Sequence, residues 1–90
     1  MVDFNFTDKK VLVFGGSRGI GQGVVKKFLY SGAEVFYAAR TQIEDTRHLS
    51  AKFFSVDLNN EKEIVSLFDK LDDFGGVDIV VNAAAINFCN

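Results

Sequence analysis

Short apolar runs alternate with segments of helical periodicity along the first half of the chain. Lys10–Phe14 (KVLVF) is apolar at all positions but the first, which is typical of a strand covered on both faces of a parallel sheet. From Ile20 onward the apolar residues recur at the spacing of one helical face, and Gly32 stands where a glycine would end that helix. Glu34–Ala39 (EVFYAA) then predicts a second strand.

A third apolar run follows a polar connection. Residues 40–50 are polar and weakly patterned, with room for one short helix. Residues 52–56 (KFFSV) are again largely apolar, which predicts a third strand that Asp57 closes.

A second helix and a fourth strand complete the pattern. Asn60 is a candidate N-cap, and Glu63, three residues later, is its candidate capping-box partner. The apolar residues that follow keep helical spacing until Gly75, which we expect to stop the helix. Residues 77–85 (VDIVVNAAA) are apolar through their centre and predict the fourth strand.

This alternation favours an α/β fold. Strands separated by helices imply a parallel sheet with right-handed crossovers and helices on both faces, in three layers. The length of 90 residues suits one domain over residues 1–90, and a hydrophobic content of 48% is enough for a core.

Composition narrows the class of protein. A net charge of −2 with no basic face speaks against a nucleic-acid partner. Cys89 is the single cysteine, which excludes an internal disulfide, and His48 stands apart from other metal ligands. No apolar stretch approaches the ~20 residues of a membrane span, and the amino terminus lacks the apolar core of a signal peptide. We therefore expect a soluble cytoplasmic protein without a membrane partner or a metal site.

Five glycines lie between residues 15 and 23, directly after the first predicted strand. Glycine inside a helix costs about 0.5–1 kcal/mol relative to alanine, so such a cluster needs a reason. A helix N-terminus exposes unpaired N–H groups and a partial positive charge, and glycine removes the side chains that would keep a phosphate away. The segment is either a tight turn alone or a phosphate site, and the number of glycines favours the phosphate site.

The glycine spacing distinguishes between kinds of phosphate site. The nucleoside-triphosphatase pattern G-x-x-x-x-G-K-[ST] fails, because Gln22 and Gly23 follow Gly21. The common dinucleotide pattern G-x-G-x-x-G is also absent. The chain instead carries G-x-x-x-G-x-G, formed by Gly15, Gly19 and Gly21.

Residues 14–21 (FGGSRGIG) resemble the T-G-x-x-x-G-[IL]-G signature of the short-chain dehydrogenases/reductases. Asp57 and Leu58 resemble the pair at the end of the family's third strand, whose aspartate contacts the adenine amino group. Residues 78–82 (DIVVN) resemble its fourth strand, and residues 82–85 (NAAA) resemble the N-N-A-G stretch along the adenosine ribose. The resemblance covers almost the whole chain. It departs from the family where Phe replaces the signature Thr and where two Ala replace the second Asn and the Gly of N-N-A-G.

The resemblance implies a Rossmann-type sheet of four strands in the order 3-2-1-4, a truncated doubly wound fold. It also implies an oxidoreductase, usually a homo-oligomer, that transfers hydride between a nicotinamide cofactor and a carbonyl or alcohol. The family's catalytic Tyr-x-x-x-Lys is missing, because Glu34 and Thr41 stand four residues after Tyr30 and Tyr37. We therefore expect the catalytic residues and the small-molecule substrate site to lie beyond Asn90, leaving this chain the nucleotide-binding half.

The end of the second predicted strand bears on the choice of cofactor. It carries no acidic residue that would bind the 2′-hydroxyl of NAD, and it carries Arg40, whose donors suit a 2′-phosphate. Arg18 stands where NADP-preferring members of the family show a second cation, and Ser17 can add a hydroxyl donor. Both arginines could instead be solvated surface charges, but together they favour NADP over NAD. The predicted cofactor-binding residues are Gly15, Ser17, Arg18, Gly19, Ile20, Gly21, Arg40, Asp57, Leu58, Asn82, Ala83 and Ala84.

Two other classes of function stay open at this point. The chain could be a stand-alone dinucleotide-binding or regulatory module without catalysis. It could also be a scaffold whose fourth strand, at the sheet edge in the order 3-2-1-4, pairs with a partner, since a flat apolar edge favours association.

Overall fold

Strands and helices alternate along the chain in the computed structural model, which describes residues 5–15, 19–40 and 51–83. The elements are β1 (Lys10–Phe14), α1 (Gly19–Tyr30), β2 (Glu34–Ala39), β3 (Lys52–Ser55), α2 (Glu61–Asp72) and β4 (Ile79–Asn82). The predicted short helix of residues 40–50 lies almost entirely outside the described residues. No helix in the described ranges is long and apolar enough to cross a membrane.

The strands form one parallel sheet in the order β3-β2-β1-β4. Val11 of β1 stands opposite Val35 of β2 on one side and Ile79 of β4 on the other, and Tyr37 of β2 stands opposite Phe53 of β3. The observed order confirms the predicted Rossmann-type α/β topology. Because all strands run the same way, their carboxyl ends meet at one end of the sheet.

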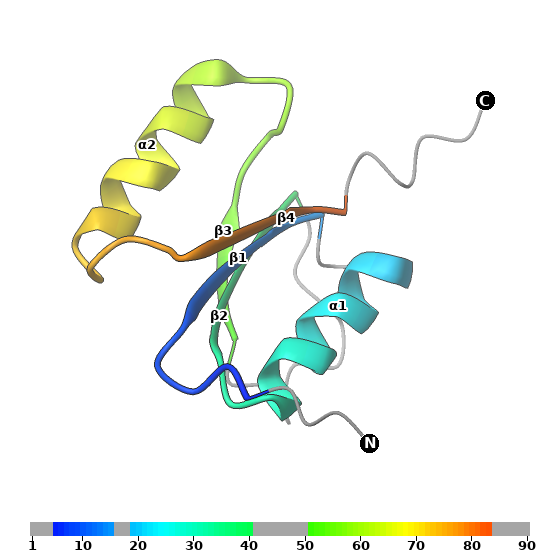
Figure 1. Cartoon of the computed structure of the whole chain (residues 1–90). Coiled ribbons are helices and arrows are strands. Elements are labelled where there is room, and N and C mark those ends of the chain that lie inside the picture. The colour runs from blue at the N-terminus through cyan, green and yellow to red at the C-terminus, as the bar shows by residue number, and fades with distance from the viewer. Residues whose placement is uncertain (1–4, 16–18, 41–50, 84–90) are drawn as a thin grey trace.

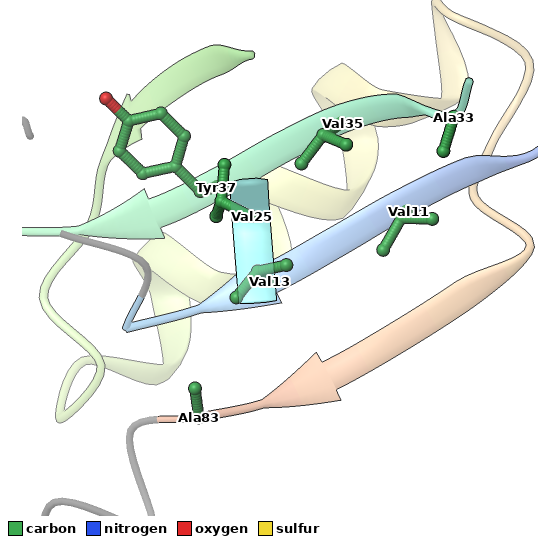
Figure 2. Packing of buried hydrophobic residues seen from close by; sticks show 7 residues of the cluster. All are labelled: Val11, Val13, Val25, Ala33, Val35, Tyr37 and Ala83. Atoms are coloured by element: carbon green, nitrogen blue, oxygen red, sulfur yellow. The ribbon is translucent and has the colours of Figure 1, made fainter. Parts of the chain in front are cut away.

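The two helices cover opposite faces of the sheet (Figure 1), so the fold has three layers. Alternation along β1 sends Val11 and Val13 toward α1, where Val25 packs against them, and sends Leu12 toward α2. Figure 2 shows the buried cluster on the α1 side, which consists of Val11, Val13, Val25, Ala33, Val35, Tyr37 and Ala83. The cluster on the α2 side consists of Leu12, Phe36, Ala38, Val56, Leu67 and Leu71.

Glycine ends helix α1 as the sequence predicts. Gly32 has a φ of 90°, a left-handed conformation that other residues rarely adopt. Its N–H donates to the carbonyl of Leu29, and the N–H of Ala33 donates to the carbonyl of Phe28, both at 3.1 Å. This pair of hydrogen bonds is the Schellman arrangement, which satisfies the last carbonyls of the helix.

The observed β3 and β4 are shorter than their predicted strands. β3 ends at Ser55, although the N–H of Val56 still donates to the carbonyl of Ala39 at 3.0 Å. β4 begins at Ile79, and Asp78 just before it already contacts β1: its carboxylate accepts from the N–H of Lys10 and its N–H donates to the carbonyl of Lys10, both at 2.8 Å. Residue 83 is the last described, so the final two residues of the predicted fourth strand lie outside the described range.

Candidate functional site

The carboxyl end of the sheet brings together residues from three strand ends. Gly15 follows β1, Arg40 follows β2, and Asp57 comes two residues after β3. They line a shallow pocket of about 250 Å³, whose described walls are Gly15, Ala39, Arg40, Val56, Asp57, Leu58 and Asn59. This is the end at which open α/β sheets bind their ligands.

The turn between β1 and α1 uses glycine for its backbone conformation. Gly15 has a φ of 79°, and its N–H donates to the carbonyl of Ala38 at 2.7 Å, which extends the ladder between β1 and β2. Gly19, the first residue of α1, has a φ of 52°, and a Cβ added there would meet no atom of the described residues within 4 Å, its chain neighbours and the helix backbone aside. Packing against the described residues therefore does not explain Gly19, whereas its left-handed backbone does.

The amino end of α1 carries no competing anion of its own. Its first turn, which holds Gly19, Ile20 and Gly21, contains no acidic residue. Gly21 is buried. Ser17 and Arg18 lie outside the described residues. No side chain of the first turn therefore neutralises the partial positive charge of this helix end.

The turn after β3 is held by the side chain of Asp57. Its Oδ1 accepts from the N–H of Asn59 at 2.9 Å and from Nη2 of Arg40 at 3.3 Å. The backbone N–H of Asp57 donates to Oε1 of Glu63 at 3.0 Å. One carboxylate oxygen thus joins the local turn to the end of the neighbouring strand.

These contacts set the charge state of Asp57. The N–H of Asn59 and, after it, the Arg40 guanidinium lower the pKa of the Asp57 carboxyl below its ordinary value, against a smaller opposing effect of burial. Asp57 is therefore an ionised acceptor at neutral pH. The Arg40 side chain is 70% exposed and that of Asp57 39%, so solvent screens the pair and it holds only weakly.

Asn60 caps α2 as predicted, while Glu63 takes a different partner. The Asn60 side chain accepts from the N–H groups of Lys62 at 3.0 Å and Glu63 at 3.4 Å. The N–H of Asn60, which a capping box would give to Glu63, donates instead to the carbonyl of Asp57 at 2.9 Å. Glu63 accepts from the Asp57 N–H and from Nδ2 of Asn60, and so ties the helix to the pocket wall.

At the carboxyl end of β4, the backbone is what remains available to a ligand at Ala83. Asn82 stands opposite Phe14 and is exposed. Ala83 is completely buried in the cluster on the α1 side, and its N–H donates to the carbonyl of Phe14 at 3.0 Å (Figure 2). Ala84 lies outside the described residues. The Ala83 side chain therefore serves the core, which leaves only its backbone for a ligand.

The pocket gathers part of the predicted set. Gly15, Arg40, Asp57 and Leu58 line it together, whereas Gly19, Gly21, Asn82 and Ala83 are not among its described walls, and the side chain of Ile20 lies outside what the structure describes. Sequence reasoning missed Asn59, whose position two residues after an aspartate is the Asx-turn signal that could have found it. Within the described ranges, no group of three or more His, Cys, Asp or Glu side chains is placed to hold a metal ion.

Comparison with known proteins gives a consistent result. Residues 9–90 match the family model of the short chain dehydrogenases. The 3-oxoacyl-[acyl-carrier-protein] reductase FabG of Chlamydia pneumoniae is 37% identical over 94% of this chain, an alignment that covers 38% of that reductase. L-fucose dehydrogenase of Mus musculus is 36% identical over 88% of this chain, which covers 31% of that enzyme.

A solved structure agrees in fold. The crystal structure of a short chain dehydrogenase from Leptospira borgpetersenii with bound NAD+ matches with a TM-score of 0.78 and 32% identity. The match covers 87% of this chain and 32% of that one. The chain thus spans only between 31% and 38% of the length of these three proteins.

Proposed function

The chain belongs to the short-chain dehydrogenase family, and from that premise we propose that it is the cofactor-binding part of an NADP(H)-dependent oxidoreductase. The reaction would interconvert a carbonyl and an alcohol. When bound, the nicotinamide supplies or accepts the hydride, while the residues described above bind and orient the adenosine end of the cofactor.

The pyrophosphate would bind at the amino end of α1. The observation that carries this assignment is the pair of left-handed glycines, Gly15 and Gly19, with open space at the second. A phosphate there would meet backbone N–H groups and the positive end of the helix dipole, with no acidic side chain in the first turn to repel it. Ser17, Ile20 and Gly21 complete the turn in this proposal.

The adenine would enter the pocket beside β2 and β3. Val56 and Leu58 give that pocket an apolar wall. Among the described residues, Asn59 and Arg40 both contact Oδ1 of Asp57, and in this proposal the other oxygen accepts from the adenine amino group. Asn82 and the backbone of Ala83 and Ala84 would follow the ribose.

The 2′-phosphate of NADP would be bound by Arg40, with Arg18 as a second cation. β2 ends at Ala39 and Arg40 follows it, so the strand end itself carries no acidic residue of the kind that binds a 2′-hydroxyl. The Arg40 side chain is 70% exposed and lines the pocket, and a guanidinium has further N–H donors besides the Nη2 group that contacts Asp57. The Leptospira relative has NAD+ bound, which supports a nicotinamide dinucleotide as the ligand class.

Titration of the protein with NADPH and NADH tests this function. Charge-assisted hydrogen bonds contribute about 1.5–3 kcal/mol each, so we expect NADPH to bind at least about tenfold more tightly. Arg40→Gln should remove most of that preference, while Lys70→Gln, which removes an exposed cation from α2, should leave it unchanged. Equal affinity for both cofactors, or an unchanged preference in Arg40→Gln, would contradict the proposal.

A further inference from the structure

The cation proposed to bind the 2′-phosphate already has an anionic partner. Arg40 approaches Asp57 with Nη2 at 3.3 Å from Oδ1, across the mouth of the pocket that both residues line. We propose that Asp57 is a specificity-determining residue that competes with the 2′-phosphate for Arg40. Its carboxylate would hold the preference for NADP below the level that Arg40 alone would give. This inference rests on the proposed function and concerns the same site.

Asp57 is the fixed member of the pair. Its Oδ1 is bound by the N–H of Asn59 at 2.9 Å, and its own N–H is bound by Glu63 at 3.0 Å. The Arg40 side chain is more exposed, and a single Nη2 contact joins it to Asp57. When a phosphate draws Arg40 away, the carboxylate therefore stays in place, and its charge remains close to the phosphate.

The geometry favours competition over orientation. A carboxylate orients a guanidinium well when two parallel N–H···O bonds join them, whereas here one contact of 3.3 Å does so in a solvent-exposed place. A contact of this kind holds Arg40 loosely enough for a 2′-phosphate to replace Asp57 as its partner, so the two anions compete for one cation. The carboxylate of Glu63, held against the Asp57 backbone, adds a second negative charge on the same side.

The proposed competition affects the binding of NADP through its 2′-phosphate and does not affect the binding of NAD. The 2′-hydroxyl of NAD carries no charge, so the Asp57 carboxylate neither repels it nor competes with it for a cation. An effect of Asp57 on the adenine would be shared by both cofactors. The ratio of affinities for two ligands that differ only in the 2′-phosphate therefore isolates the proposed competition.

Calorimetric titration with adenosine 2′,5′-bisphosphate and adenosine 5′-monophosphate measures this ratio without the nicotinamide. Asp57→Asn keeps an oxygen for the Asn59 N–H and so preserves the turn. In this variant we expect the preference for the 2′-phosphorylated ligand to rise about three- to tenfold at low salt, and the rise to shrink at high salt.

Two controls separate competition from a general change of charge. Asp72→Asn makes the same charge change at the last residue of α2, and it should leave the ratio unchanged. In an Arg40→Gln background, adding Asp57→Asn should change the ratio much less than it does in the wild type. An equal rise in both backgrounds would overturn the competition for Arg40.

The remaining outcomes decide between this inference and the proposed function. A fall in the ratio for Asp57→Asn would make Asp57 a residue that positions Arg40, and an unchanged ratio would give it no part in specificity; either result overturns the inference. A wild-type protein that binds neither ligand overturns the proposed function and this inference together. A wild type that prefers the bisphosphate, with an Asp57→Asn ratio that does not rise, overturns the inference alone.

Discussion

Two strand-to-helix turns lie at the same end of the sheet and are built in opposite ways. The turn from β3 into α2 satisfies its own backbone: Asn60 caps the helix, and Glu61 and Glu63 place negative charge in its first turn. The turn from β1 into α1 has left-handed glycines at Gly15 and Gly19 and no acidic residue in the first helical turn. One turn is satisfied by its own side chains, whereas the other has a positive helix end without an acidic residue, where we propose that the pyrophosphate binds.

Helices α1 and α2 differ in intrinsic stability, but packing against the sheet holds both in place. Glycines weaken α1 and good capping strengthens α2, yet both helices are held by side chains buried against the sheet. Val25 of α1 is completely buried, and Leu67 and Leu71 of α2 are each 1% exposed. Because the core fixes α1, its amino end can be shaped for binding instead of for stability.

Gly19→Val gives the largest expected effect and tests directly whether the turn between β1 and α1 binds a phosphate. A β-branched residue at a φ of 52° is strained, and its side chain would enter the open space beside the turn. We expect the affinity for NADPH to fall at least about tenfold. Fluorescence titration measures it, with circular dichroism to verify the fold. A folded Gly19→Val protein with wild-type affinity would remove the phosphate site from this turn.

Asn60→Ala should show the reverse behaviour in the other turn. Loss of the cap should lower the free energy of unfolding by about 1 kcal/mol, measured by urea denaturation. NADPH affinity should change little, because we place the phosphate site in the other turn. Asn60→Asp keeps a capping oxygen and should retain the stability. A loss of affinity as large as that of Gly19→Val would show that the two turns are not functionally distinct.

Gly23→Ala separates the glycines that the site needs from one that it does not. Gly23 lies within α1, and an added Cβ would meet no atom of the described residues within 4 Å beyond its own helix backbone. We expect the variant to be more stable by about 0.5–1 kcal/mol with unchanged NADPH affinity. Thermal and urea unfolding measure the gain. A clear loss of affinity would extend the binding site one turn further along α1.

The smallest expected effect is on the pKa of Asp57, which NMR of its carboxyl carbon can measure. Arg40→Gln should raise the pKa of Asp57 only part of the way toward its ordinary 3.8, because the N–H of Asn59 has the larger effect and remains. Because the pKa of Asp57 is lower in the folded state than in the unfolded state, its ionised carboxylate stabilises the fold at any pH above the unfolded-state pKa. That contribution is lost as the pH falls through the folded pKa, in the range below 3.8. A pKa unaffected by Arg40→Gln would show that the ion pair does not form in solution.

Local patterns in the sequence were enough to place the strands, the helices and the cap. The apolar run of Lys10–Phe14, the helical spacing after Ile20, the cap at Asn60 and the glycine after α1 each depend on neighbours a few residues away. Such short-range preferences act before any tertiary contact forms, so they can be recognised in the chain alone. The strand order came from the family resemblance, since periodicity does not specify which strands are neighbours.

The tertiary structure decided which of these residues meet. The contact between Arg40 and Asp57, the burial of Ala83 and the reach of Glu63 to the Asp57 N–H depend on which strand ends lie side by side. The same sheet order brings Arg40 and Asp57, 17 residues apart in the chain, to the rim of one pocket. Such contacts are fixed by the register and packing of the whole sheet, and no local pattern of hydrophobic and polar residues specifies them.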